Sequence, residues 1–181
     1  MKSKNNVQTA IFGSGCFWCA EAIFSQLRGV ESVTPGYAGG NKPDPTYQEV
    51  CTNITGHAEV VRIVFDPTII TYADLLEIFW QVHDPTTPNR QGNDMGSQYR
   101  SLILYSDLNQ KQTAYEMLAE LEESKTFPSA IVTEIMPLKD FYPAEEYHKE
   151  YYFQNRMQPY CQFVISPKLE KFKKAFKEKL A

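Results

Sequence analysis

The sequence lacks the long apolar run that a membrane-spanning helix needs. No stretch of its 181 residues comes near the roughly 20 consecutive apolar residues required. It also lacks an excess of positive charge, because 18 Lys and Arg residues stand against 22 Asp and Glu residues and give a formal net charge of −4. These two absences argue against a membrane and against nucleic acid as partners.

The start of the chain is short of apolar side chains as well. Residues 1–6 read Met-Lys-Ser-Lys-Asn-Asn and lack the apolar segment of a secretory signal peptide. We therefore expect the protein in the cytoplasm, where thiols are kept reduced. Four cysteines in that compartment favour redox, catalytic or metal chemistry over a structural set of disulfides.

The cysteines do not have the spacing of a zinc site. Such a site usually takes its ligands from two close pairs, whereas here a single close pair, Cys16 and Cys19, is followed by isolated Cys51, His57 and Cys161. We expect no metal and no other cofactor. A non-enzymatic metal-binding or redox-sensing module is therefore the most distant of the functions considered.

What the sequence does contain is an alternation of strand and helix patterns. Alternating or continuous apolar runs predict strands at residues 9–12, 30–37, 58–65, 101–105 and 131–136. Apolar positions at helical spacing predict helices after residue 15, after residue 71, and at 107–124, 143–153 and 168–180. This order predicts the α+β class, with a mixed sheet and helices packed against it.

No internal repeat, low-complexity tract or linker divides the chain. We therefore predict a single catalytic domain over residues 1–181, with the amphipathic helix at 168–180 packed on it. Two long polar loops, at 36–46 and 83–98, interrupt the regular elements, and loops of this length in a compact domain are usually functional. Thr71 and Asp74 form a capping-box pattern at the start of one predicted helix.

The most informative stretch is Gly13-Ser14-Gly15-Cys16-Phe17-Trp18-Cys19. It follows the first predicted strand and opens the first predicted helix, so Cys16 lies among unpaired backbone N–H groups at the positive end of the helix dipole. Both features favour the thiolate, which is the nucleophilic form of cysteine. The alternative is a buried helix start whose cysteine is only a small hydrophobe. Phe17 and Trp18 favour a reactive thiol in an apolar pocket.

Cys16 and Cys19 also form a Cys-x-x-Cys pair, a pattern typical of redox chemistry at the start of a helix. A thiol–disulfide oxidoreductase of thioredoxin type is therefore the second function considered. That function fits less well, because the chain is rich in loops and the two residues between the cysteines are large and apolar.

Several polar residues could assist a reactive thiol. Glu59 stands in an otherwise apolar strand and is either a charge on the solvent face or a buried carboxyl with a raised pKa that donates a proton. His57 is an equally plausible proton carrier, or a turn residue. Tyr47 and Tyr99 could be ordinary loop-edge residues, and Asp94 could be an ordinary turn former.

Taken together, these motifs resemble those of a known family. Gly15-Cys16-Phe17-Trp18 looks like the catalytic motif of the A-type peptide methionine sulfoxide reductases. Its other signatures are similar to residues 36–40, 45–47, 55–59, 89–94 and 98–101 of this chain. The matches follow in order from about Ile11 to Cys161, and several independent motifs make the resemblance specific.

This resemblance implies a ferredoxin-like α+β core wrapped by long loops. It also implies an oxidoreductase for protein repair that reduces methionine-S-sulfoxide, free or in proteins, and is recycled by thioredoxin. The roles it implies are Cys16 as nucleophile, Glu59 as acid catalyst, Tyr47, Asp94 and Tyr99 as groups that bind or polarise the sulfoxide oxygen, and Phe17 and Trp18 as holders of the substrate methyl group.

The resemblance does not identify the thiol that resolves the oxidised nucleophile, because recycling cysteines vary in position across the family. We predict Cys161, since the turn-rich stretch at 158–162 should move more easily than a helix interior. The alternative is that Cys161 only packs under the C-terminal helix. Cys19 is the rival, but Cβ atoms at i and i+3 of a helix lie about 5–6 Å apart, and a relaxed disulfide needs about 3.5–4.5 Å. Cys51 is a third candidate, expected to be a small buried hydrophobe.

Overall fold

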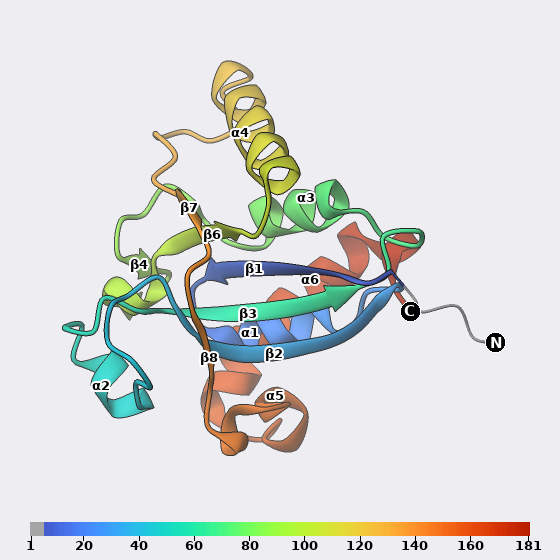
Figure 1. The fold of residues 1–181 in the computed structure, drawn as a ribbon. Helices are drawn as coiled ribbons and strands as arrows, with labels where there is room; N and C mark the ends of the chain where they lie inside the picture. The colour runs from blue at the N-terminus through green and yellow to red at the C-terminus, as the bar shows by residue number, and fades with distance from the viewer. Residues whose placement is uncertain (1–5) are drawn as a thin grey trace.

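The structure is a computed structural model that describes residues 6–181, so most of the polar start considered above lies outside the described residues. Figure 1 shows a central sheet with helices at its back and at its upper and lower edges. The strands of this sheet are β1 (Gln8–Ser14), β2 (Val30–Ala38), β3 (Ala58–Phe65), β6 (Ser101–Tyr105), β7 (Glu134–Pro137) and β8 (Phe141–Pro143). The helices are α1 (Phe17–Phe24), α2 (Tyr47–Cys51), α3 (Tyr72–Val82), α4 (Leu108–Glu123), α5 (Tyr151–Gln154) and α6 (Ser166–Ala175).

The sheet of the described chain has the strand order β7-β6-β1-β3-β2-β8. All neighbouring strands are antiparallel except β6 and β7, which are parallel. Within it, β1-α1-β2-β3-α3-β6 forms the split βαβ arrangement of ferredoxin-like folds. The predicted α+β class with a mixed sheet is therefore confirmed, and so is the ferredoxin-like core.

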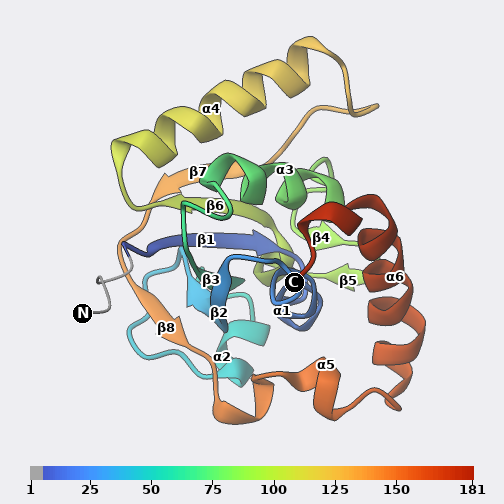
Figure 2. The same cartoon turned by 90° about the vertical axis from the view of Figure 1, so that its right-hand side faces the viewer.

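The two faces of the sheet are covered differently. Helices α1, α3 and α6 lie together on one side of it (Figure 2), over the larger apolar core. Because side chains alternate along a strand, β3 sends Val61 and Ile63 into this core and Val60 into a smaller cluster on the other face. Glu59 shares the face of Val61 and Ile63, which means that its carboxyl is directed to the helix side.

The predicted capping box at the start of α3 is present. The Thr71 hydroxyl accepts a hydrogen bond from the backbone N–H of Asp74 at 3.1 Å, and the Asp74 carboxylate accepts one from the N–H of Thr71 at 2.9 Å. These bonds satisfy two N–H groups that have no partner inside the helix. They fix the start of α3, which buries Leu75, Leu76 and Phe79 against the sheet.

The C-terminal third differs most from the sequence prediction. The helix predicted at 143–153 is wrong: this part holds the end of β8, a 3₁₀ turn at Glu146–His148 and the short α5. A single helix cannot run through it, because Glu150 adopts the left-handed conformation with φ of +51°. The helix predicted at 168–180 instead begins at Ser166 and ends at Ala175, and a 3₁₀ turn at Lys177–Lys179 follows.

The segment predicted to be turn-rich, at 158–162, is helical from residue 159 onward. Residues Cys161–Ile165 form a π-helix that continues directly into α6. Pro167 falls where the π-helix passes into α6, at the second residue of α6. Leu169 and Phe172 then pack the helix on the core.

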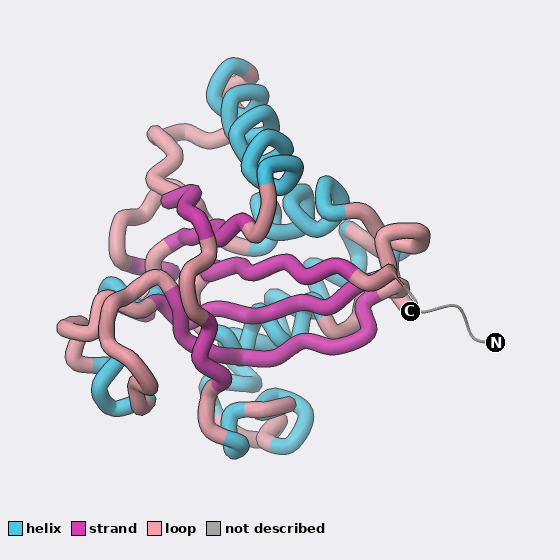
Figure 3. The backbone as a smooth tube through the Cα atoms, in the orientation of Figure 1, coloured by secondary structure: helices cyan, strands magenta, loops and turns pink. Residues whose placement is uncertain are grey.

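Long connections gather at one end of the sheet (Figure 3). β1 and β2 end there and β3 begins there, as their antiparallel pairing requires. The connection between β3 and β6 adds a small hairpin of β4 (Arg90–Gln91) and β5 (Asp94–Met95). Within residues 6–181, no helix combines the length and the apolar character needed to cross a membrane.

We predict that Thr71→Ala destabilises the protein by about 1 kcal/mol, the usual effect of losing a helix-capping hydroxyl. The midpoint of urea unfolding measures this change. Thr113→Ala, in the middle of α4, is the matched control and should not lower the midpoint, because alanine is the better helix former there. An equal loss in both variants would contradict the capping role.

Candidate functional site

A cavity of about 170 Å³ lies where β1 passes into α1. Its walls come from α1, α2, β3, the loop between β4 and β6, and the segment before the π-helix. They are lined by Cys16, Phe17, Trp18, Tyr47, Glu59, Asp94, Tyr99 and Tyr160. The structure thus brings together seven of the residues singled out from the sequence and adds Tyr160.

Cys16 occupies the N-cap of α1, as the strand–turn–helix pattern predicts. Gly15 directly precedes Cys16, and its φ of +99° is a backbone conformation that residues with a Cβ rarely adopt. A Cβ on Gly15 would also lie 2.6 Å from Cγ of Gln91. The Gln91 amide is itself held by two hydrogen bonds to the backbone of Asp84, at 3.0 and 2.9 Å. Gln91 of β4, anchored to the preceding loop, therefore packs against the turn that carries the thiol.

Cys16 and Cys19 lie one helical turn apart at the start of α1, and both are buried. Burial raises the pKa of Cys16 well above its usual range, and the neighbouring Cys19 thiol adds to this effect. The Cys16 thiol lowers the pKa of Cys19. Of the two thiols, Cys16 lines the cavity and Cys19 does not.

Glu59 lies next to the start of α1 with only 2% of its surface exposed. One carboxylate oxygen accepts a hydrogen bond from the backbone N–H of Phe17 at 3.0 Å. Burial, and then the neighbouring Cys16 thiol, raise the pKa of Glu59 well above its usual range. Glu59 is consequently a buried carboxyl that favours its protonated form, rather than a charge on the solvent face.

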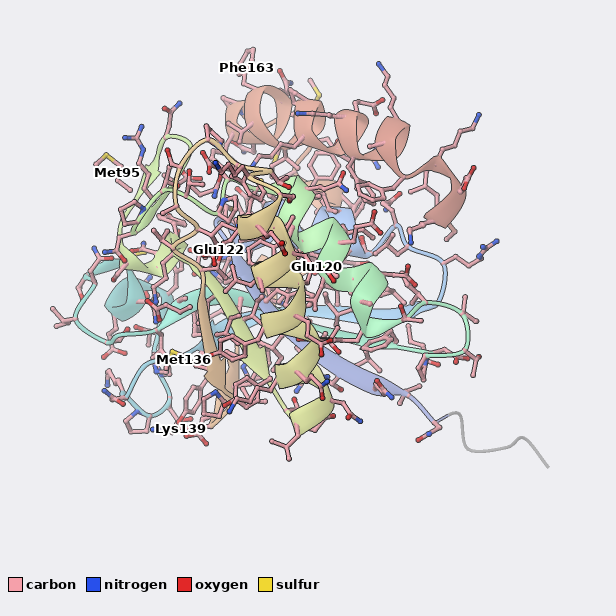
Figure 4. All side chains as sticks on the ribbon, turned by 90° about the horizontal axis from the view of Figure 1, so that it is seen from above. Met95, Glu120, Glu122, Met136, Lys139 and Phe163 are labelled. Carbon is pink, nitrogen blue, oxygen red and sulfur yellow. The ribbon has the colours of Figure 1, made fainter. Side chains whose placement is uncertain are left out.

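Three tyrosines, Tyr47, Tyr99 and Tyr160, also line the cavity. Burial raises the pKa values of Tyr47 and Tyr99, with the Glu59 carboxyl as the next cause, so both hydroxyls keep their protons and can donate hydrogen bonds. Tyr160 donates to the Asp94 carboxylate at 2.6 Å. Met95, the neighbour of Asp94, is 71% exposed and lies at the periphery of the molecule (Figure 4).

Trp18 forms part of the apolar wall of the cavity, and His148 and Tyr151 hold its indole in place. Its indole N–H donates a hydrogen bond to Nδ1 of His148 at 3.1 Å, and its rings stack on Tyr151 with centroids 3.7 Å apart. The buried His148 ring also lies 5.0 Å from Phe17 and 4.7 Å from Tyr47. Three residues of the cavity wall thus share one supporting imidazole.

The sequence prediction missed Tyr160 and His148. Both lie in segments where the predicted secondary structure was wrong, and neither belongs to a motif that we recognised. The one available signal for Tyr160 was its place directly before Cys161.

Three other candidates lie outside the cavity walls. His57 organises a loop: Nδ1 accepts the N–H of Gly40 at 3.0 Å, so Nε2 donates to the carbonyl of Lys42 at 2.7 Å. Cys51 is exposed at the end of α2, so its expected burial is wrong. Cys161 is fully buried in the π-helix. Burial raises its pKa, and the nearby Cys16 adds to the effect.

All four cysteines are free thiols. Among residues 6–181, no group of three or more His, Cys, Asp and Glu side chains is placed to hold a metal ion. The chemistry available in the cavity is therefore that of a thiol, a protonated carboxyl and several hydroxyls against aromatic walls.

Known proteins share both the sequence and the fold. A family model described as peptide methionine sulfoxide reductase matches residues 8–180. The peptide methionine sulfoxide reductase MsrA of Sulfolobus acidocaldarius is 57% identical over 173 residues, which cover 96% of this chain and 97% of that protein.

Solved structures agree with this match. Mxr1 from Saccharomyces cerevisiae in reduced form superposes with a TM-score of 0.78 at 30% identity, over 89% of this chain and 92% of that one. The structure of Mxr1 in complex with Trx2 has the same fold, with a TM-score of 0.56 at 23% identity over 83% of this chain and 88% of that one. The chain therefore belongs to the peptide methionine sulfoxide reductase family.

Proposed function

We propose that this protein reduces methionine-S-sulfoxide, free or in proteins, with Cys16 as the nucleophile and Glu59 as the proton donor. The observation that carries the proposal is the placement of a buried Glu59 carboxyl beside the Cys16 thiol in a cavity with aromatic walls. Family membership supports the substrate class, and repair of methionine sulfoxide uses one enzyme for each sulfoxide epimer.

The chemistry of a sulfoxide explains why these groups stand together. Its sulfur is electrophilic, but its oxygen is transferred only when a proton and hydrogen bonds relieve the negative charge that develops on it. Cys16 attacks as the thiolate, Glu59 supplies the proton, and Tyr47 and Tyr99 donate hydrogen bonds to the oxygen. The oxygen remains on Cys16 as a sulfenic acid, and the thioether of methionine leaves.

A second thiol must then regenerate Cys16. The sulfenic acid condenses with that thiol to form a disulfide and water, and thioredoxin reduces the disulfide by thiol–disulfide exchange. The complex of the yeast protein Mxr1 with Trx2 supports this partner. Because the cycle needs reduced thiols, we place the protein in the cytoplasm. We also propose that residues 1–181 act as a single catalytic unit.

We propose Cys161 as the resolving thiol, although the predicted mobility of its segment is not what supports it. The π-helix around Cys161 is a rare conformation that is frequent at functional sites. Cys161 also directly follows Tyr160, which lines the same cavity as Cys16, and Cys16 is near enough to contribute to the raised pKa of Cys161. Cys19 remains the rival because it is buried one helical turn from Cys16. Their Cys-x-x-Cys spacing favours the thioredoxin-type oxidoreductase as the second function.

Reduced protein mixed with methionine sulfoxide, without any reductant, should form about one methionine per protein molecule. Cys16→Ser should form none, because a hydroxyl is far less ionised than a thiol at neutral pH. Amino-acid analysis of the quenched mixture measures the yield, and Cys51→Ser is the matched control that keeps it. A thioredoxin-type oxidoreductase would form no methionine at all in this experiment.

Glu59→Gln should slow sulfenic acid formation by roughly 10²–10⁴-fold, the usual span for general acid catalysis. Glu59 donates only while protonated, so the wild-type rate should fall as the pH rises through its raised pKa. Glutamine does not titrate, and the variant should lose this fall. Rapid-quench single turnovers across pH measure both effects, with Glu170→Gln on α6 as control. A normal rate in Glu59→Gln would make water the proton source.

Cys161→Ser should still release one methionine but stall in steady state with thioredoxin, whereas Cys19→Ser should continue to turn over. The physical reason is that only the resolving thiol is needed to convert the sulfenic acid into a disulfide. Mass spectrometry after thiol blocking should map a Cys16–Cys161 link in the unmutated protein. A dominant Cys16–Cys19 or Cys16–Cys51 link would assign resolution to the other cysteine.

A further inference from the structure

A second buried carboxylate stands on α1, outside the chemistry described so far. Glu21 lies one helical turn after Phe17, is 4% exposed and does not line the cavity. Both of its carboxylate oxygens accept the backbone N–H of Glu150, at 2.9 and 3.0 Å. Burial raises the pKa of Glu21 to about 7. Burying a carboxyl is costly unless its hydrogen bonds are made, so this contact needs an explanation.

The hydrogen bonds between Glu21 and Glu150 hold a chain segment whose side chains support Trp18. Glu150 follows the 3₁₀ turn at Glu146–His148 and precedes α5, and its left-handed conformation turns the chain between them. His148, two residues before Glu150, accepts the indole N–H of Trp18. Tyr151, directly after Glu150, stacks on the same indole. The Glu150 N–H, which Glu21 binds, therefore lies between His148 and Tyr151, the two residues that contact the Trp18 indole.

We propose that Glu21 is a positioning residue whose carboxylate, by holding the N–H of Glu150, keeps His148 and Tyr151 against Trp18 and so fixes the wall that receives the substrate thioether. The proposal rests on the proposed function of this cavity. It assigns Glu21 to substrate affinity through Trp18, without contact between Glu21 and the substrate.

Other contacts hold the rest of the segment and the thiol side of the cavity. Glu145 holds the opposite end, because its carboxylate accepts the Tyr37 hydroxyl at 3.0 Å and the Tyr47 N–H at 3.1 Å. Cys16 and Glu59 are linked through the N–H of Phe17, which does not involve this segment. Loss of the Glu21 contact should therefore loosen the part around Glu150 and leave the thiol and the proton donor in place.

Trp18 itself can report the effect. The chain has two tryptophans, and the second, Trp80, has an indole N–H without a hydrogen-bond partner among the described residues. Trp80→Phe therefore removes no hydrogen bond and leaves Trp18 as the single fluorophore. In this parent, we compare Glu21→Ala, which removes the acceptor, with Glu21→Gln, which keeps an acceptor oxygen. Glu31→Gln is the matched control, since Glu31 is an exposed carboxylate in the same surface groove as Glu21.

Glu21→Ala should lower kcat/KM for methionine sulfoxide by about tenfold, the order expected when a hydrogen bond to a charged group is lost. The loss should fall on KM more than on kcat, and Trp18 emission should shift to longer wavelength as the indole becomes freer. Glu21→Gln should restore both values to within about threefold of the parent, because its amide oxygen still accepts one hydrogen bond. Glu31→Gln should match the parent.

A folded Glu21→Ala protein with unchanged Trp18 emission and KM would overturn the proposal, and so would a kcat loss with unchanged KM. If Glu21→Ala does not fold, Glu21→Leu replaces it, since leucine fills a similar volume without an acceptor. Failure of that variant to fold as well would show a purely structural role and also overturn the proposal. If the parent reduced no methionine sulfoxide, the proposed function would fail, while a shift in Trp18 emission would still support the positioning role.

Discussion

The hydrogen bond from the backbone N–H of Phe17 to the Glu59 carboxyl joins the start of α1 to the start of β3. It is formed inside the apolar core, where an unpaired carboxyl and an unpaired helix N–H would each be destabilising. Because Cys16 is the residue directly before this N–H, the same contact holds the Glu59 carboxyl close to the residue that carries the thiol. The ferredoxin-like order of the sheet makes the contact available, since it places β1 beside β3 with α1 across their shared face.

Burial of this pair also sets its protonation. Burial and the nearby Cys16 thiol favour the neutral acid, while the hydrogen bond from the Phe17 N–H acts in the opposite direction. A carboxyl on the surface would instead be ionised. In the proposed mechanism, Cys16 attacks the substrate sulfur while Glu59 gives its proton to the sulfoxide oxygen.

The sequence predicted the part of the structure that depends on local patterns. The strand–glycine–helix pattern placed Cys16, and the position of Glu59 in an otherwise apolar run at residues 58–65 allowed burial as one of its two interpretations. Prediction from the sequence failed where long-range contacts decide the conformation, as around residues 141–165. There, the contacts of Glu145 with Tyr37 and of Glu21 with Glu150 hold short elements that no local periodicity encodes. Tyr160 and His148 belong to this part, which explains why the cavity was predicted without them.

The packing of Gly15 against Gln91 has a consequence for how this chain can vary. The Gln91 side chain cannot swing aside to admit a Cβ, because both ends of its amide are bonded to the backbone of Asp84. Any larger residue at position 15 would therefore displace the loop before β4 as well as strain the turn. Positions 15 and 91 are thus a linked pair, and an engineered change of the approach to Cys16 has to alter both at once.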